Sequence, residues 1–64
     1  MLQNMAGDAR GRMLAAAFEI ATRDGVDAVS TRAVCTAAGV QAPSLYHHFG
    51  DRAGLIRTVV DTAF

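Results

Sequence analysis

The chain has very little of the residue types that brace small proteins covalently or place them in membranes. It contains one cysteine, one proline and no tryptophan, and none of its six basic residues is a lysine. A single cysteine cannot form an internal disulfide. We therefore expect a cytoplasmic protein without covalent cross-links. No stretch approaches the roughly 18 consecutive apolar residues of a membrane-spanning helix, so we expect no membrane partner.

Length and charge restrict the function further. Sixty-four residues build one small core, which excludes a second domain, a barrel or a deep cofactor-binding fold. We therefore expect no cofactor. Six arginines balance five aspartates and one glutamate, so the formal net charge of zero argues neither for nor against a nucleic-acid partner. The positions of the arginines have to decide that question.

The first eight residues differ from the rest of the chain. Residues 1–8 are polar, contain a glycine and show no periodicity, so we expect a flexible N-terminal arm. They have neither the basic region nor the apolar segment of a signal peptide. Asp8 is suited to cap the helix that follows. We therefore assign residues 9–64 to the folded domain.

The remaining sequence predicts an all-α fold. Thirteen alanines and few β-branched runs favour closely packed helices. Apolar periodicity predicts helices over residues 9–24, 31–38, about 42–49 and from 52 onward. Ser30 and Asp51 are good caps, and Gly25 and Gly39 favour the left-handed conformation that ends a helix. A hairpin at Gly25 is the alternative, but no alternating strands flank it.

The first predicted helix has a broad apolar face. Met13, Ala17, Ile20 and Ala21 share one side of the helix, and Leu14 and Phe18 widen it. The second helix turns Val34 and Ala38 inward, with Cys35 beside them. The fourth carries a long apolar stripe, formed by Leu55, Ile56, Val59, Val60, Ala63 and Phe64. A three-helix core cannot cover all of that stripe, so we expect part of it to face another domain or another chain.

The second and third predicted helices form a helix-turn-helix unit through Gly39. In such a unit the second helix of the pair lies in the major groove of DNA. A helical wheel puts Leu45 and Phe49 on the buried side of the third helix. The other side and its flanks carry Pro43, Ser44 and His47, with Tyr46 and His48 near the two edges. This division suits a recognition helix, but it is equally that of an ordinary amphipathic surface helix.

Longer stretches of the sequence resemble the TetR family of transcriptional regulators. Residues 30–40 resemble the second helix and turn of that family, and residues 41–49 its recognition helix. Residues 50–55 resemble the start of its fourth helix. The most specific feature is Ala-Gly-Val followed at fixed spacing by Leu-Tyr-His-His-Phe and a basic residue. The resemblance implies a small homeodomain-like bundle of three helices plus the start of a fourth.

The resemblance also implies which residues meet double-stranded DNA. The positions that match base-contacting ones are Arg32, Gln41, Ala42, Pro43, Ser44 and His47. The positions that match phosphate-contacting ones are Ser30, Thr31, Tyr46, His48 and Arg52. The plain alternatives are a solvated surface arginine at position 32, helix caps at positions 30 and 31, and partial core packing for Tyr46.

The family further implies a transcriptional regulator, usually a repressor, that binds a palindromic operator as a homodimer. Its members continue into a helical domain that dimerises and binds a small-molecule effector, and this domain is absent from the sequence. Gln41 replaces the usual serine and predicts a weak cap for the third helix. Cys35 replaces a small alanine. Gly54 stands where members have a helix former, at a cost of about 0.5–1 kcal/mol.

Other chemistry is weakly supported. Ser44, His48 and Asp51 suggest a catalytic triad, but so small a chain offers no substrate cleft or oxyanion hole, so we expect no enzyme. Cys35 and the two histidines suggest zinc, but adjacent helical histidines diverge and a fourth ligand is missing, so we expect no metal. The remaining alternative is a helical interaction module that binds a partner protein through the apolar face of the fourth helix.

Overall fold

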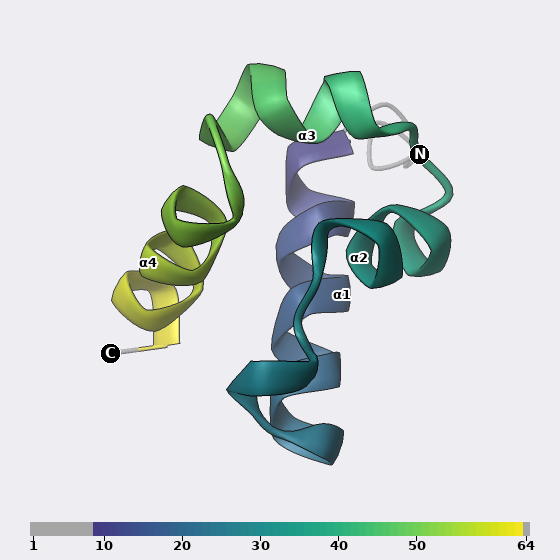
Figure 1. Ribbon diagram of the computed structural model, residues 1–64. Coiled ribbons are helices and arrows are strands. Elements are labelled where there is room, and N and C mark those ends of the chain that lie inside the picture. The colour runs from purple at the N-terminus through teal and green to yellow at the C-terminus, as the bar shows by residue number, and fades with distance from the viewer. Residues whose placement is uncertain (1–8, 64) are drawn as a thin grey trace, which may run out of the picture.

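A computed structural model describes residues 9–63 of the chain and has the predicted all-α fold (Figure 1). The helices are α1 (Ala9–Asp24), α2 (Thr31–Ala38), α3 (Ala42–Phe49) and α4 (Arg52–Ala63), and a short 3-10 turn, η2 (Val26–Ala28), follows α1. These bounds agree with the predicted ones. The proposed arm, the Asp8 cap and Phe64 lie outside the described residues. None of the helices between residues 9 and 63 has the length and hydropathy of a membrane-spanning segment.

The ends of α2 follow from local side-chain and backbone chemistry. The Ser30 hydroxyl accepts a hydrogen bond from the amide of Ala33 at 3.0 Å, which satisfies a free donor of the first turn. At the other end, Gly39 takes a left-handed conformation with φ 72° and ψ 34°. The amides of Gly39 and Val40 both donate to the carbonyl of Cys35, which closes the helix. Both signals were correctly predicted from the sequence.

Gly25 ends α1, but not in the left-handed conformation that the sequence predicts. Its φ of 96° is positive, whereas its ψ of 158° is extended. That combination is available essentially only to glycine. The Gly25 amide still donates to the carbonyl of Ala21, and its own carbonyl accepts from the amide of Ala28. The extended ψ lets one residue close α1 and start η2 at once.

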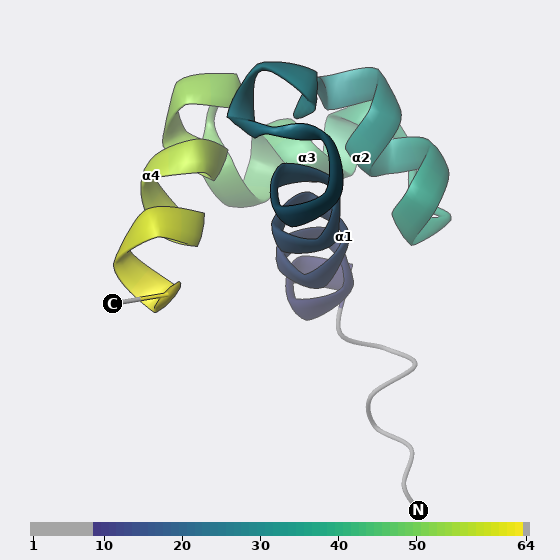
Figure 2. The same ribbon diagram turned by 90° about the horizontal axis from the view of Figure 1, so that it is seen from below.

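Helix α1 runs through the centre of the bundle and packs against η2, α2, α3 and α4 (Figure 2). Each helix turns small or medium apolar side chains toward it. The fully or nearly fully buried residues are Met13, Ala16, Ala17, Ile20, Val29, Val34, Cys35, Leu45 and Leu55. None of the buried side chains that the structure describes is polar or charged. The core is therefore a single apolar cluster to which every helix contributes.

The junction between α3 and α4 is unusually close. Gly50 takes φ 86°, and its amide donates to the carbonyl of Tyr46 at 2.9 Å. The Asp51 carboxylate then caps α4 by accepting the amide of Gly54 at 2.8 Å, as its sequence position predicts. A Cβ atom at Gly54 would overlap the carbonyl oxygen of Phe49. Glycine at position 54 is thus explained by backbone approach between the two helices.

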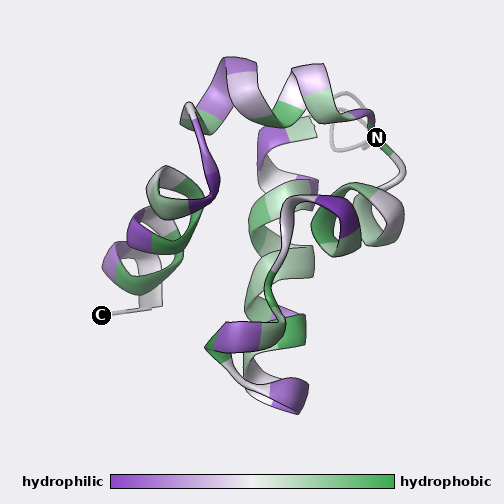
Figure 3. Cartoon of the chain, viewed as in Figure 1, coloured by the Kyte–Doolittle hydropathy of each residue, from purple (hydrophilic) through white to green (hydrophobic). Residues whose placement is uncertain are grey.

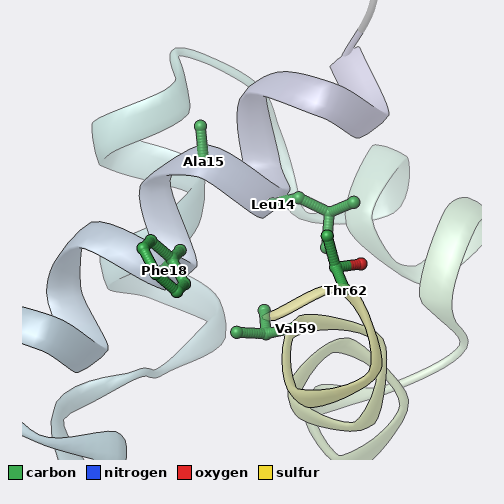
Figure 4. Close-up of a pocket in the computed structure, with 5 residues that line it drawn as sticks. All are labelled: Leu14, Ala15, Phe18, Val59 and Thr62. Atoms are coloured by element: carbon green, nitrogen blue, oxygen red, sulfur yellow. The ribbon is translucent and has the colours of Figure 1, made fainter. Parts of the chain in front are cut away.

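An apolar groove of about 270 Å³ lies between α1 and α4. Leu14, Ala15 and Phe18 line it from α1, and Val59 and Thr62 line it from α4 (Figure 4). The sequence puts Phe18 on the apolar face of α1, but Phe18 is 52% exposed, on the wall of this groove. The sequence predicts that the core cannot cover the whole apolar stripe of α4. Val60, which belongs to that stripe, is indeed 43% exposed.

Candidate nucleic-acid interface

Helix α3 lies across the N-terminal end of α1, with one side against the bundle (Figure 1). Leu45 is completely buried and fixes the rotation of the helix about its axis. Phe49 is half-buried at its C-terminal end. Pro43 occupies the first turn, where no amide partner is lost, and Gln41 makes no side-chain cap, as the sequence predicts. Packing on one side therefore presents the other side of α3 to solvent.

The outer side of α3 carries the predicted base-facing residues. Gln41, Ala42, Pro43 and His47 are exposed, whereas Ser44 is half-buried beside Leu45. Tyr46 is 50% exposed and His48 is also exposed, at the flanks of the helix. Figure 3 shows hydrophilic colour on the C-terminal half of α3. Apart from Ser44, the predicted DNA-contacting side chains of α3 and its cap residue Gln41 are therefore all exposed.

An aromatic and cationic cluster forms at the C-terminal end of α3. The rings of His47 and His48 lie 5.2 Å apart and nearly perpendicular, and the ring of His48 lies 6.2 Å from that of Phe49. The Arg10 guanidinium carbon from α1 lies 5.6 Å from the centre of the Phe49 ring, within range of a cation–π interaction. The sequence does not predict a role for Arg10, because nothing local to it indicates contact with a residue so distant in the chain.

The N-terminal end of α2 brings together three more predicted residues. Ser30 caps the helix, Thr31 is half-buried and Arg32 is exposed. Ser30 and Arg32 border a shallow depression of about 510 Å³ that Arg23 of α1 also lines. The guanidinium of Arg23 pairs with Asp24 at 3.2 Å, on the surface. Because α2 packs against α3, these residues belong to the same helix-turn-helix unit as the outer side of α3.

Arg52, the fifth predicted phosphate-contacting residue, has partners within the chain that the sequence does not reveal. Its Nε donates to the carbonyl of Val29 at 2.6 Å, and its Nη2 donates to the carbonyl of Val26 at 3.3 Å. The residue remains exposed overall. A guanidinium has five N–H donors, so three are left for other partners.

The groups considered for metal binding do not meet. Cys35 lies in the core, whereas His47 and His48 are exposed on α3. Over residues 9–63, no three histidine, cysteine, aspartate or glutamate side chains gather closely enough to hold a metal ion.

Comparisons with known proteins agree with this arrangement. Residues 13–59 match the family described as bacterial regulatory proteins, tetR family. The HTH-type transcriptional regulator UidR of Escherichia coli strain K12 is 35% identical over 63 residues, and that of Shigella flexneri is identical to the same degree. The match covers 94% of this chain but only 32% of UidR, so the chain spans about a third of the length of these relatives. No solved structure matches.

The family match begins in α1, includes the helix-turn-helix of α2 and α3 and ends in α4. It therefore covers every described helix and most of the chain. The chain belongs to the TetR family of bacterial regulatory proteins and carries its helix-turn-helix domain.

Proposed function

We propose that the chain is the sequence-specific DNA-binding part of a transcriptional regulator, with α3 as its recognition helix. The observation that carries this proposal is the division of α3, in which Leu45 is completely buried while Tyr46 and His47 beside it are exposed. A short helix held in this way can enter the major groove without disturbing the core. Its family membership and the regulator UidR among its relatives support the same function, rather than catalysis.

The contacts divide into those that read bases and those that position the domain. We assign base contacts to Arg32 and to the exposed or half-exposed side of α3, namely Gln41, Ala42, Pro43, Ser44 and His47. An arginine fork suits guanine, and the apolar Ala42 and Pro43 suit a thymine methyl group. We assign phosphate contacts to Ser30, Thr31, Tyr46 and His48. Arg52 is set apart from them, because its guanidinium is already bonded to two carbonyls of the chain.

We further propose that the regulator acts as a homodimer on a palindromic operator, most simply as a repressor. Two recognition helices about 34 Å apart would then occupy successive major grooves. UidR is about three times as long as the match, which covers 32% of it. Dimerisation and effector binding would reside in a region like the remaining part of UidR. Since a bacterial operator lies in the cytoplasm, the protein would act there. A single copy provides half of the contacts, so it should bind weakly.

A second candidate function is supported by the groove between α1 and α4. Its lining is almost wholly apolar, and Phe18 on its wall is 52% exposed. An interaction module that binds a partner helix there would depend on Phe18 and Val59 and respond little to salt. DNA binding would instead depend on Arg32 and Tyr46 and weaken with salt.

The first prediction concerns Arg32 and Tyr46. The probe is a duplex selected by the chain from a randomised pool. Arg32→Ala should lower affinity for it by about fivefold or more, because a lost arginine–guanine pair costs about 1–3 kcal/mol. Tyr46→Phe removes one hydroxyl and should lower affinity about twofold to tenfold, since a hydrogen bond contributes about 0.5–1.5 kcal/mol. Fluorescence anisotropy measures both.

The control is Arg57→Ala, which removes an exposed arginine from α4, outside the helix-turn-helix. It should leave affinity nearly unchanged. Both test variants should keep the midpoint of thermal unfolding within a few degrees of the parent. Unfolding of both would show that the two residues are structural, and failure to select any duplex at low salt would contradict the proposed function itself.

A further inference from the structure

Arg52 makes two hydrogen bonds to the segment that leads into α2. Its Nε meets the carbonyl of Val29 at 2.6 Å and its Nη2 meets the carbonyl of Val26 at 3.3 Å. Val26 begins η2 and Val29 is the residue that follows it, so the two contacts bracket this turn. Val29 itself is only 2% exposed, and its bond to Arg52 is partly shielded from water. A carbonyl in such a place needs a partner.

The two carbonyls belong to the segment that leads into the start of α2, where residues that we assign to DNA lie. Ser30 caps α2 immediately after Val29, and Arg32 follows in the first turn. The carbonyl of Val26 also accepts the amide of Val29 at 3.0 Å, which closes η2. Arg52 therefore holds both ends of the turn that determines where α2 begins.

The base of the Arg52 side chain is itself fixed. Arg52 opens α4, whose first turn is capped by the Asp51 carboxylate on the amide of Gly54. Leu55, three residues later, is completely buried. By contrast, η2 and α4 are not among the pairs of elements that pack extensively against each other. The guanidinium thus bridges two elements that are otherwise little connected.

We propose that Arg52 is a positioning residue, which ties the first turn of α4 to the carbonyls of Val26 and Val29 and thereby sets the position of Ser30 and Arg32 relative to α3. Its effect on DNA affinity rests on the proposed function, whereas the bridge itself does not. A planar guanidinium can hold two carbonyls at once, and a lysine ammonium on its flexible stem cannot reproduce that fork.

The alternative role of Arg52 is the phosphate contact that the family resemblance implies. The two roles predict opposite results for Arg52→Lys. A phosphate contact needs mainly the positive charge, which lysine keeps. A bridge to two carbonyls needs the fork, which lysine lacks.

The first test uses NMR of the free 64-residue chain. The Nε proton of Arg52 should exchange with water about tenfold more slowly than that of the exposed Arg57, because a hydrogen bond protects it. Arg52→Lys should shift the amides of residues 26–33, and Arg57→Lys should not. Equal exchange at the two arginines, or shifts confined to residues next to position 52, would overturn the proposal without any reference to DNA.

The second test measures affinity for a mixed-sequence DNA duplex at several salt concentrations. Positioning predicts that Arg52→Lys weakens binding about as much as Arg52→Ala, and that neither changes the salt dependence. A phosphate contact predicts that lysine restores affinity and that alanine lowers the slope of log affinity against log salt by about 0.9. Restored affinity with lysine together with a lower salt slope for alanine would contradict the proposal. If the parent chain binds no duplex, only the proposed function fails, since the exchange measurement still decides the bridge.

Discussion

Replacing Gly54 with alanine is expected to lower the midpoint of thermal unfolding by roughly 5–15 °C, although alanine is the better helix former. The reason is the close junction of α3 and α4. A Cβ at position 54 would overlap the carbonyl oxygen of Phe49 and lie 3.3 Å from its carbonyl carbon. Both atoms are backbone, so the overlap is relieved only if the two helices move apart.

The balance of free energies favours destabilisation. Alanine gains about 1 kcal/mol of helix propensity over glycine. Forcing a group into a filled site costs about 1–3 kcal/mol and more where backbone must move. Leu55, next to Gly54, is completely buried, so displacing α4 also disturbs the core. A domain of this size has only about 3–5 kcal/mol of stability to lose.

Thermal unfolding followed by circular dichroism measures this effect, with Ala53→Gly as the control. Ala53 is exposed in the same turn of α4. Its replacement reports the propensity difference alone, a loss of about 1 kcal/mol. We expect both variants to be less stable than the parent. A Gly54→Ala variant that is more stable, by about as much as Ala53→Gly is less stable, would show that α3 and α4 do not approach so closely.

The second large effect is expected at Leu45. Leu45→Ala should abolish the cooperative unfolding transition, so that the chain is largely unfolded at room temperature. Leu45 is completely buried on α3, and truncating such a leucine costs about 2–5 kcal/mol. That range matches the whole stability expected of a domain below about 70–80 residues. DNA binding should be lost with the fold.

A matched control lies on the opposite side of the same helix. His47 is exposed, so His47→Ala should keep the unfolding transition within a few degrees of the parent and change only DNA affinity. Urea denaturation and anisotropy with the selected duplex separate the two effects. A folded Leu45→Ala variant, or an unfolded His47→Ala variant, would mean that α3 is rotated relative to the described packing.

The sequence predicts the helices well because their limits are set by nearby residues. Ser30, Asp51 and Gly39 each act on amides or carbonyls within a few positions, so their effects can be deduced without a fold. The burial of Leu45 follows in the same way from helical periodicity. Even the missing side-chain cap at Gln41 is a local property.

The remaining features depend on which helices meet. Phe18 belongs to the apolar face of α1, yet it is 52% exposed, on the wall of the groove between α1 and α4. From the sequence, Gly54 only weakens the fourth helix. The structure explains it, because the carbonyl of Phe49 leaves no room for a side chain there. The bonds of Arg52 reach residues 23 and 26 positions away, and the contact of Arg10 with Phe49 spans most of the chain. No local pattern encodes such distant partners.

DNA recognition by α3 is tested most directly by an amide-resolved NMR titration of the chain with a short mixed-sequence duplex at low salt. The titration detects weak binding and locates it in one experiment. We expect shifts clustered on Arg32 and on residues 41–48, which disappear as salt is added. An absence of shifts, or shifts confined to residues 14–18 and 59–62 around the apolar groove, would contradict the assignment of α3 as the DNA-reading helix.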